Sequence, residues 1–324
     1  MLAQIFALVA LCLVLIYATS LIVRSIKIVA RQSRLGVYGI TAFILAISTS
    51  LPELVVSIVS AFEGNTSLVL GNIIGSNIAD LSLVIGGAAI LGGSLKVTGE
   101  VLSRDIYLTG AAGFLPIFLI ADGVLSRADG VVLLVIYMIL VSTFLHAHHK
   151  ALASHVMAVS PMRRFLLTVT SANGHSGVLK FVAGVGLLLV ASHFIVKIAT
   201  ALALTSGLST LFVGLFIVAV GTSLPELAFE LKAIGSGQAK MALGDLLGSV
   251  VANSTLILGL ASIIRPLTLT QRGLIPYGMA IGAFTIIYFT FVWFVKTKKK
   301  LEWWEGLILL AGFMIFALAE LSRQ

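Results

Sequence analysis

Long apolar runs separated by short polar connections dominate this chain. Ten of them are long enough to cross a hydrocarbon layer about 30 Å thick as helices. The runs cover about 4–22, 37–61, 67–92, 104–121, 130–147, 178–201, 210–234, 241–264, 274–295 and 303–321. This pattern predicts an all-α polytopic membrane protein with ten transmembrane helices, the first of them a retained span rather than a removed signal peptide.

The composition excludes a soluble globular protein. Of the 324 residues, 59% are hydrophobic and only 10% are charged, whereas soluble domains average about 25% charged residues. Most of the 21 lysines and arginines fall on one side if the first connection is cytoplasmic, and such an excess marks the cytoplasmic face. The distribution of these basic residues therefore indicates that both termini lie outside. The net charge of +8 reflects this distribution rather than nucleic-acid binding. The single Cys12 excludes an internal disulfide and is expected to pack.

The chain contains two copies of one motif. The sequence Thr-Ser-Leu-Pro-Glu-Leu at 49–54 returns at 222–227, an offset of 173 residues, and 71–76 matches 244–249 at the same offset. This duplication predicts a first repeat at 1–147 with its motif at 46–80, a cytoplasmic linker at 148–177, and a second repeat at 178–324 with its motif at 219–253. Because each repeat holds five spans, the second must cross the membrane in the inverted sense, which is typical of secondary transporters.

Each copy places a carboxylate beside a proline within an apolar run. A charged side chain at the centre of a bilayer costs about 2.5–3.5 kcal/mol, so such residues are functional by default. Proline frees backbone carbonyls from the helical hydrogen-bond pattern. Pooling both copies gives an all-oxygen set of candidate metal ligands, which consists of the carbonyls of Ala46 and Ala219, the hydroxyls of Thr49, Ser50, Ser76, Thr222, Ser223 and Ser249, the carboxylates of Glu53, Asp80 and Glu226, and the amide of Asn253. Oxygen ligands in flexible geometry suit Ca²⁺, with Na⁺ as a competitor.

Other polar residues leave alternatives open. The cluster at 146–149, which contains three histidines, is either a metal-binding regulatory element or a solvated loop. His193 is expected to be a helix-packing histidine. Asp245 either contacts an ion or supports its neighbours, and Glu230 either lines an inner vestibule or is a helix-end charge paired with a lysine.

The repeated TSLPE motif, followed by the GNxxGSN pattern at 71–77, resembles the alpha repeats of the cation/Ca²⁺ exchanger superfamily, most closely the prokaryotic (archaeal-type) Na⁺/Ca²⁺ exchangers. The resemblance implies ten helices in the cell membrane of a prokaryote, with ions bound between the second, third, seventh and eighth by the residues named above. Asp80 and Asn253 stand in the reverse of the usual order, and Val250 replaces an asparagine, which leaves the driving ion open. The family's Ca²⁺/H⁺ branch has a glutamate soon after Gly-Asn, and its absence here favours Na⁺.

These observations predict a secondary active antiporter that exchanges Ca²⁺ for Na⁺ by alternating access, with the first and sixth helices sliding against the others. A Ca²⁺/H⁺ antiporter is the alternative. An intramembrane protease built on Asp80 and Asp245 and a passive cation channel are weighed against it, and the duplication favours transport. No enzymatic activity, cofactor, nucleic acid or obligatory protein partner is expected. The partners are Ca²⁺, Na⁺ or H⁺, and the lipid bilayer.

Overall fold

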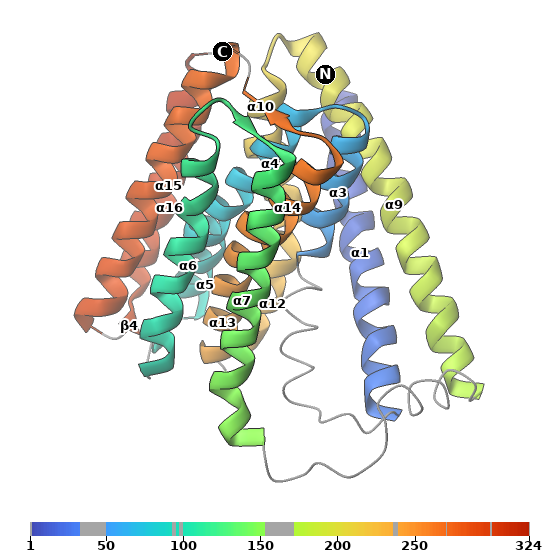
Figure 1. Cartoon of the computed structure of the whole chain (residues 1–324), viewed down its shortest axis with the longest axis vertical. Coiled ribbons are helices and arrows are strands. Elements are labelled where there is room, and N and C mark those ends of the chain that lie inside the picture. Colours follow the sequence, from blue (N-terminus) through green and yellow to red (C-terminus); the bar gives the residue numbers. More distant parts are fainter. Residues whose placement is uncertain are drawn as a thin grey trace.

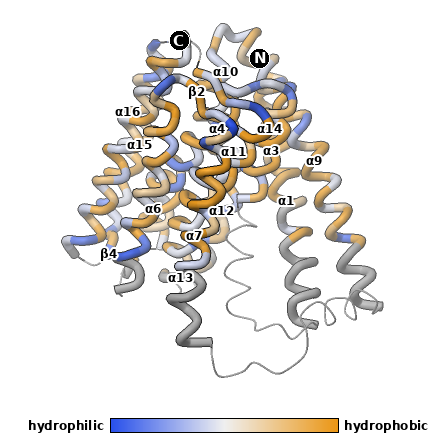
Figure 2. Tube along the Cα trace, viewed as in Figure 1, coloured by the Kyte–Doolittle hydropathy of each residue, from blue (hydrophilic) through white to orange (hydrophobic). Residues whose placement is uncertain are grey.

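A computed structural model describes residues 2–32, 50–92, 95–96, 100–152, 172–235, 239–269, 271–298 and 300–323. The chain forms a bundle of long helices (Figure 1). Within these ranges, seven helices are long and apolar enough to cross a membrane. Hydrophobic residues cover most of the length of the outer helices α9, α15 and α16 (Figure 2). The prediction of a helical polytopic membrane protein is confirmed.

The first half of the chain runs from α1 to α7. Its helices are α1 (Leu2–Gln32), α3 (Leu51–Phe62), α4 (Thr66–Ala79), the π-helical turn η1 (Asp80–Val84), α5 (Ile85–Gly92), α6 (Glu100–Leu119) and α7 (Arg127–Leu152). Helices α6 and α7 overlap the segments predicted as spans at 104–121 and 130–147, but they are not among the seven helices found long and apolar enough within the described residues. The beginning of the span predicted at 37–61 lies outside the described residues.

The second half repeats this order. Its helices are α9 (Ala172–Ser206), α10 (Thr210–Phe212), η2 (Val213–Val218), α11 (Ala219–Thr222), α12 (Leu224–Gly235), α13 (Ala239–Val251), η3 (Ala252–Ile257), α14 (Leu258–Ile264), α15 (Gln271–Lys298) and α16 (Trp303–Leu321). Both bounds of α12 lie 173 positions after those of α3, and α13 begins 173 positions after α4. The repeat in the sequence is therefore a repeat in secondary structure.

Helices α7 and α9 extend further than the sequence predicted. Helix α7 continues to Leu152 and α9 begins at Ala172, so both enter the segment assigned to the linker. The backbone of 146–149 is thus helical, whereas the side chains of its histidines lie outside the described part of the structure. The loop interpretation of this cluster is wrong for its backbone.

Two short antiparallel strand pairs join the halves. Strand β1 (Leu95–Lys96) pairs with β4 (Lys300–Leu301), and β2 (Val124–Leu125) pairs with β3 (Leu267–Thr268). The pairs lie at opposite ends of the bundle (Figures 1 and 2). Both chain ends lie at the β2–β3 end, whereas α7 ends and α9 begins at the other (Figure 1).

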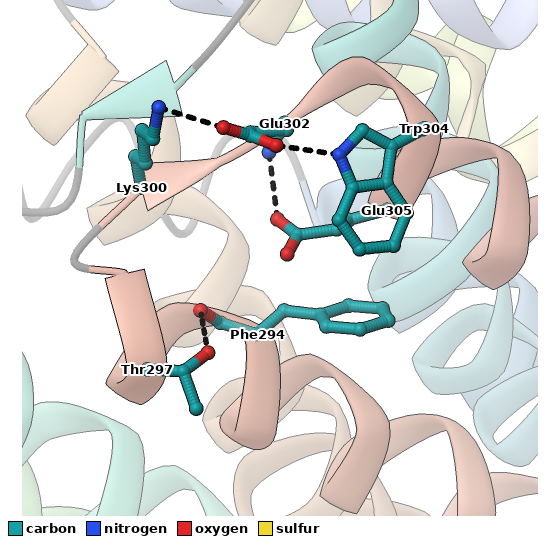
Figure 3. Close-up of polar contacts among 6 residues, drawn as sticks. All are labelled: Phe294, Thr297, Lys300, Glu302, Trp304 and Glu305. Carbon is teal, nitrogen blue, oxygen red and sulfur yellow. Dashed lines mark hydrogen bonds and ion pairs between the residues drawn. The ribbon is translucent and has the colours of Figure 1, made fainter.

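A polar cluster fixes the turn from β4 into α16 (Figure 3). Lys300 Nζ lies 2.6 Å from Glu302 Oε1, and this hydrogen bond raises the pKa of Lys300. The indole N–H of Trp304 donates to the other carboxylate oxygen of Glu302, and the backbone N–H of Glu302 donates to Glu305 Oε2 at 2.8 Å. Nearby, the Thr297 hydroxyl donates to the carbonyl of Phe294. Glu302 and Glu305 together form a capping box, which satisfies backbone donors that the first turn of α16 would otherwise leave free.

Helices α1 and α9 pack side by side at one edge of the bundle (Figure 1). Their buried leucines and isoleucines, such as Leu8, Leu15, Leu188 and Ile195, form an apolar cluster of their own with a few residues of α3, α4 and η2. A larger core fills the space among α4, α5, α13, α14, α15 and α16. The α1–α9 pair is therefore distinct in packing from the rest of the bundle.

Candidate functional site

The repeated proline begins a helix in both halves. Pro52 lies in the first turn of α3, where the missing N–H breaks no helical hydrogen bond. In the second half, α11 ends at Thr222 and α12 begins at Leu224, so Ser223 and the turn before Pro225 interrupt the helix. The interruption places Glu53 and Glu226 in the first turns of α3 and α12. Both glutamates are almost fully buried.

The carbonyl of Ala219 is not freed by this interruption. It accepts the backbone N–H of Ser223 at 3.0 Å and the Thr222 hydroxyl at 3.1 Å. The expectation that this carbonyl lacks a hydrogen-bond partner is therefore wrong, because Pro225 lies too far along the chain to remove the bond from Ser223. Ala46 and Thr49 lie outside the described residues.

Hydrogen bonds across the repeat bring the two motifs together. The Ser223 hydroxyl lies 3.5 Å from Glu53 Oε1, and the Thr222 hydroxyl lies 3.4 Å from Asn72 Oδ1. Ser223 also interacts with Asp80. The break between α11 and α12 therefore faces the beginning of α3 and the middle of the α4–η1 helix.

Asp80 and Asn253 occupy π-helical turns in both halves. Asp80 begins η1, and Asn253 lies in η3 at the position 173 residues later. A π-helical turn inserts an extra residue into a helix, which redirects nearby side chains, and it frequently marks functional sites. Both residues are 1% exposed. The structure thus gives this Asp/Asn pair the same backbone setting despite its reversed order.

The described ligand candidates all lie in the buried interior of the bundle. Those that lie in the described residues are Ser50, Glu53, Ser76, Asp80, Thr222, Ser223, Glu226, Ser249 and Asn253, and each is at most 3% exposed. Several of their oxygens have no hydrogen-bond partner in the described structure, among them those of Ser50, Ser76 and Ser249 and one oxygen each of Glu53, Asp80, Glu226 and Asn253. Buried polar atoms are normally paired, so these oxygens are candidates for cation binding.

Carboxylates concentrate in this region. Glu53, Asp80, Glu226, Glu230 and Asp245 are all buried, and members of the set lie within Coulombic range of one another. Like charges in a low-dielectric interior repel strongly, so the cluster requires cationic charge when it is ionised. No three carboxylate, histidine or cysteine side chains of the described residues converge closely enough to hold a metal ion alone. Hydroxyl, amide and carbonyl oxygens must therefore complete any site.

Two asparagines escaped the ligand prediction. The Asn72 amide donates to the Ser57 hydroxyl at 3.1 Å, and its oxygen accepts a hydrogen bond from the Thr222 hydroxyl. Asn77 donates to the Ser254 hydroxyl at 2.8 Å across the repeat. Both belong to the GNxxGSN pattern, so their position in that motif was the available signal. They connect the helices that carry the ligand candidates.

His193 does not pack within the bundle. It is exposed, and its Nδ1 lies 2.7 Å from Glu63 Oε1 in the turn between α3 and α4. The packing prediction for His193 is wrong, because its ring extends from α9 toward a polar turn.

The family follows from a sequence comparison. A model of the family described as sodium/calcium exchanger protein matches residues 3–146 and 176–321. The chain belongs to this family. A putative antiporter CaxA from Alkalimonas amylolytica is 31% identical to it over 96% of both chains.

Solved structures of exchangers share the fold. The sodium-calcium exchanger NCX_Mj, soaked with Na⁺ and Sr²⁺, is 26% identical, with a TM-score of 0.64 over 98% of this chain and 99% of that one. The H⁺/Ca²⁺ exchanger CAX has a TM-score of 0.72 over 98% of this chain and 85% of that one at 15% identity, which shows a shared fold alone. These relatives are ion exchangers and antiporters, not enzymes. The interpretation as an intramembrane protease is therefore discarded.

Proposed function

We propose that this exchanger family member is a secondary active antiporter that exchanges Ca²⁺ for Na⁺ by alternating access. The observation that carries the proposal is the buried oxygen cluster shared by the two motifs. Glu53 of the first motif and Ser223 of the second contact each other inside the bundle, so neither half contains the site alone.

The ligands we assign are the twelve predicted residues. They are Ala46, Thr49, Ser50, Glu53, Ser76 and Asp80 in the first motif, and Ala219, Thr222, Ser223, Glu226, Ser249 and Asn253 in the second. Ca²⁺ takes six to eight oxygens at about 2.3–2.6 Å. Three carboxylates balance either one Ca²⁺ or several Na⁺ ions, which is the physical basis for competition and exchange.

We further propose that the chain is built as two inverted five-helix repeats, at 1–147 and 178–324, joined by a linker at 148–177. The equal bounds of α3 and α12 support the repeat. The strand pairs support the inversion. Strand β3 of the second half lies about 173 positions after β1 of the first, yet the two strands belong to pairs at opposite ends of the bundle. Ten spans remain the best account of ten apolar segments.

Alternating access requires a part that moves against a fixed part. The α1–α9 pair meets this requirement because it has its own apolar cluster and carries none of the proposed ligands. Apolar contacts are non-directional, so the apolar cluster does not prevent this pair from shifting along the bundle. The contact between His193 of α9 and Glu63 of the α3–α4 turn would break in the shift, and solvent can reach both side chains. Cation binding would neutralise the carboxylates and permit the shift.

Sodium is the favoured coupling ion. NCX_Mj, at 26% identity over the whole chain, is described as a sodium-calcium exchanger, whereas the likeness to CAX concerns the fold alone. The described site also offers hydroxyls on both sides of the repeat, which suit Na⁺. A Ca²⁺/H⁺ antiporter is the second candidate, because Asp80 stands where the resemblance leads one to expect an asparagine.

The proposed location is the cell membrane of a prokaryote, with both termini outside. The asymmetry of basic residues supports this orientation, and both chain ends lie at one end of the bundle. Lipid is the surrounding partner, and neither a cofactor nor a further protein enters the mechanism.

The test is to neutralise each glutamate separately. We expect Glu53→Gln and Glu226→Gln each to weaken Ca²⁺ binding at least tenfold, which is about 1.4 kcal/mol, and to abolish exchange in proteoliposomes. Asp122→Asn, in an exposed turn, is the matched control and should transport as the wild type does. Full Ca²⁺ flux in either glutamine variant, with the protein folded, would contradict the proposal.

A further inference from the structure

Glu230 is a buried carboxylate that the proposed exchange site does not use. It is 0% exposed, and neither of its oxygens has a hydrogen-bond partner in the described structure. The sequence offered a vestibule lining or a helix-end charge paired with a lysine. The carboxylate is enclosed within the bundle, and the side chains of the two lysines considered in the second interpretation, Lys232 and Lys240, lie outside the described residues.

The packing of α12 against α13 places a second acid opposite Glu230. Glu226 and Glu230 are four residues apart on α12 and share one face, as Asp245 and Ser249 do on α13. The two helices pack together, and Asp245 is the strongest electrostatic neighbour of Glu230, followed by Asp80. Ser249 is fully buried, and its hydroxyl oxygen also lacks a hydrogen-bond partner in the described residues. The Glu230 carboxylate therefore lies within electrostatic range of other carboxylates and has no hydrogen-bond partner in the described structure.

The first half shows what these positions hold when no charge is present. Counting back 173 residues, Glu230 corresponds to Ser57 and Asp245 to Asn72. There the Asn72 amide donates to the Ser57 hydroxyl at 3.1 Å, which satisfies both groups. The second half replaces this neutral pair with two carboxylates, neither of which can donate a hydrogen bond when ionised. A cation bound beside Glu230 would offset the repulsion between the two carboxylates.

We propose that Glu230 and Asp245 form a second metal-cation site, with the Ser249 hydroxyl at its boundary with the central site. The occupant is a hard cation, Na⁺ or Ca²⁺, because all the available ligands are oxygens. The site lies one helical turn from Glu226 toward the connection between α12 and α13. It has no counterpart among the described residues of the first half, so it makes the ion pathway asymmetric. This inference rests on the proposed function, since it adds one cation-binding site to the same ion pathway.

The chain itself supplies the design of the test variant. Glu230→Ser combined with Asp245→Asn copies the neutral Ser57–Asn72 pair, which already packs in the other half, so this double variant should fold. Equilibrium dialysis of purified full-length protein with ⁴⁵Ca²⁺ and, separately, ²²Na⁺ counts the cations bound per chain. We expect the double variant to bind one cation fewer than the wild type for at least one of the two isotopes and to retain central-site binding.

Controls separate this inference from the proposed function. Glu226→Gln should weaken the central site while a cation still binds at Glu230, and the melting temperature in the absence of cations monitors folding. Equal counts for both isotopes in the wild type and the double variant would overturn the second site. A double variant that changes only the number of protons released would overturn it as well. Failure of the wild type to bind Ca²⁺ would instead overturn the proposed function.

Discussion

Replacing Gly75 with alanine would place a methyl group where α4 meets η2 across the repeat. That Cβ would overlap the carbonyl oxygen of Leu215 and would lie 2.7 Å from both Leu215 Cα and Ala219 Cβ. Two of these three neighbours are backbone atoms, so no side-chain rotation relieves the overlap. Ordinary van der Waals contact begins at 3.4 Å, so relieving the two 2.7 Å contacts alone requires a separation of about 0.7 Å, and the closer overlap with the Leu215 oxygen requires more.

The separation has an energetic and a functional consequence. Overpacking of this kind costs about 1–3 kcal/mol, which is a roughly 5- to 150-fold change in the ratio of folded to unfolded protein. The shift also moves Ala219 away from Ser76, which neighbours Gly75 and is a proposed ligand. We expect Gly75→Ala to lower both the melting temperature and Ca²⁺ affinity.

The assay compares melting temperature and ⁴⁵Ca²⁺ uptake with those of a matched variant. Gly87→Ala in α5 is that control, because among the described residues its added Cβ would meet only Leu227 Cδ1, at 3.6 Å, an ordinary contact. If Gly75→Ala matched Gly87→Ala in both measurements, the close approach of α4 and η2 would not be what holds the two motifs in register.

Two further predictions concern the edges of the bundle. Gly221→Ala should weaken the packing of α1 and lower the melting temperature, because the new methyl would overlap Cys12 Sγ. Adding Cys12→Ala should restore most of the lost melting temperature, and a double variant as unstable as the single one would refute this contact. Lys300→Met should melt below the wild type at neutral pH. This difference in melting temperature should vanish as the pH rises through the raised pKa of Lys300, because a group whose pKa is raised on folding stabilises only while protonated. A difference that persisted unchanged at alkaline pH would contradict the role of Glu302.

The helical character of the chain could be predicted from apolar runs, and the repeat from one constant spacing between motifs. Glu53 and Glu226 could be predicted as candidate site residues, because a carboxylate inside an apolar run is costly unless it has a function. The offset also paired Asp80 with Asn253 before their π-helical turns were seen.

Other features depend on tertiary contacts that no local pattern encodes. The links from Asn72 to Thr222 and from Asn77 to Ser254 join residues more than a hundred positions apart. The enclosure of Glu230 likewise follows from the packing of α12, α13 and their neighbours rather than from its place in the helix. The extent of α7 beyond the apolar run was missed because its last turns are polar and leave the hydrophobic pattern.

The central claim is tested most directly by Ca²⁺ uptake into proteoliposomes under an imposed Na⁺ gradient, compared with an imposed pH gradient. The account predicts uptake driven by the Na⁺ gradient alone and lost in Glu53→Gln. Uptake driven only by the pH gradient would contradict coupling to Na⁺ and establish Ca²⁺/H⁺ exchange, and the absence of uptake under both gradients would contradict Ca²⁺ antiport itself.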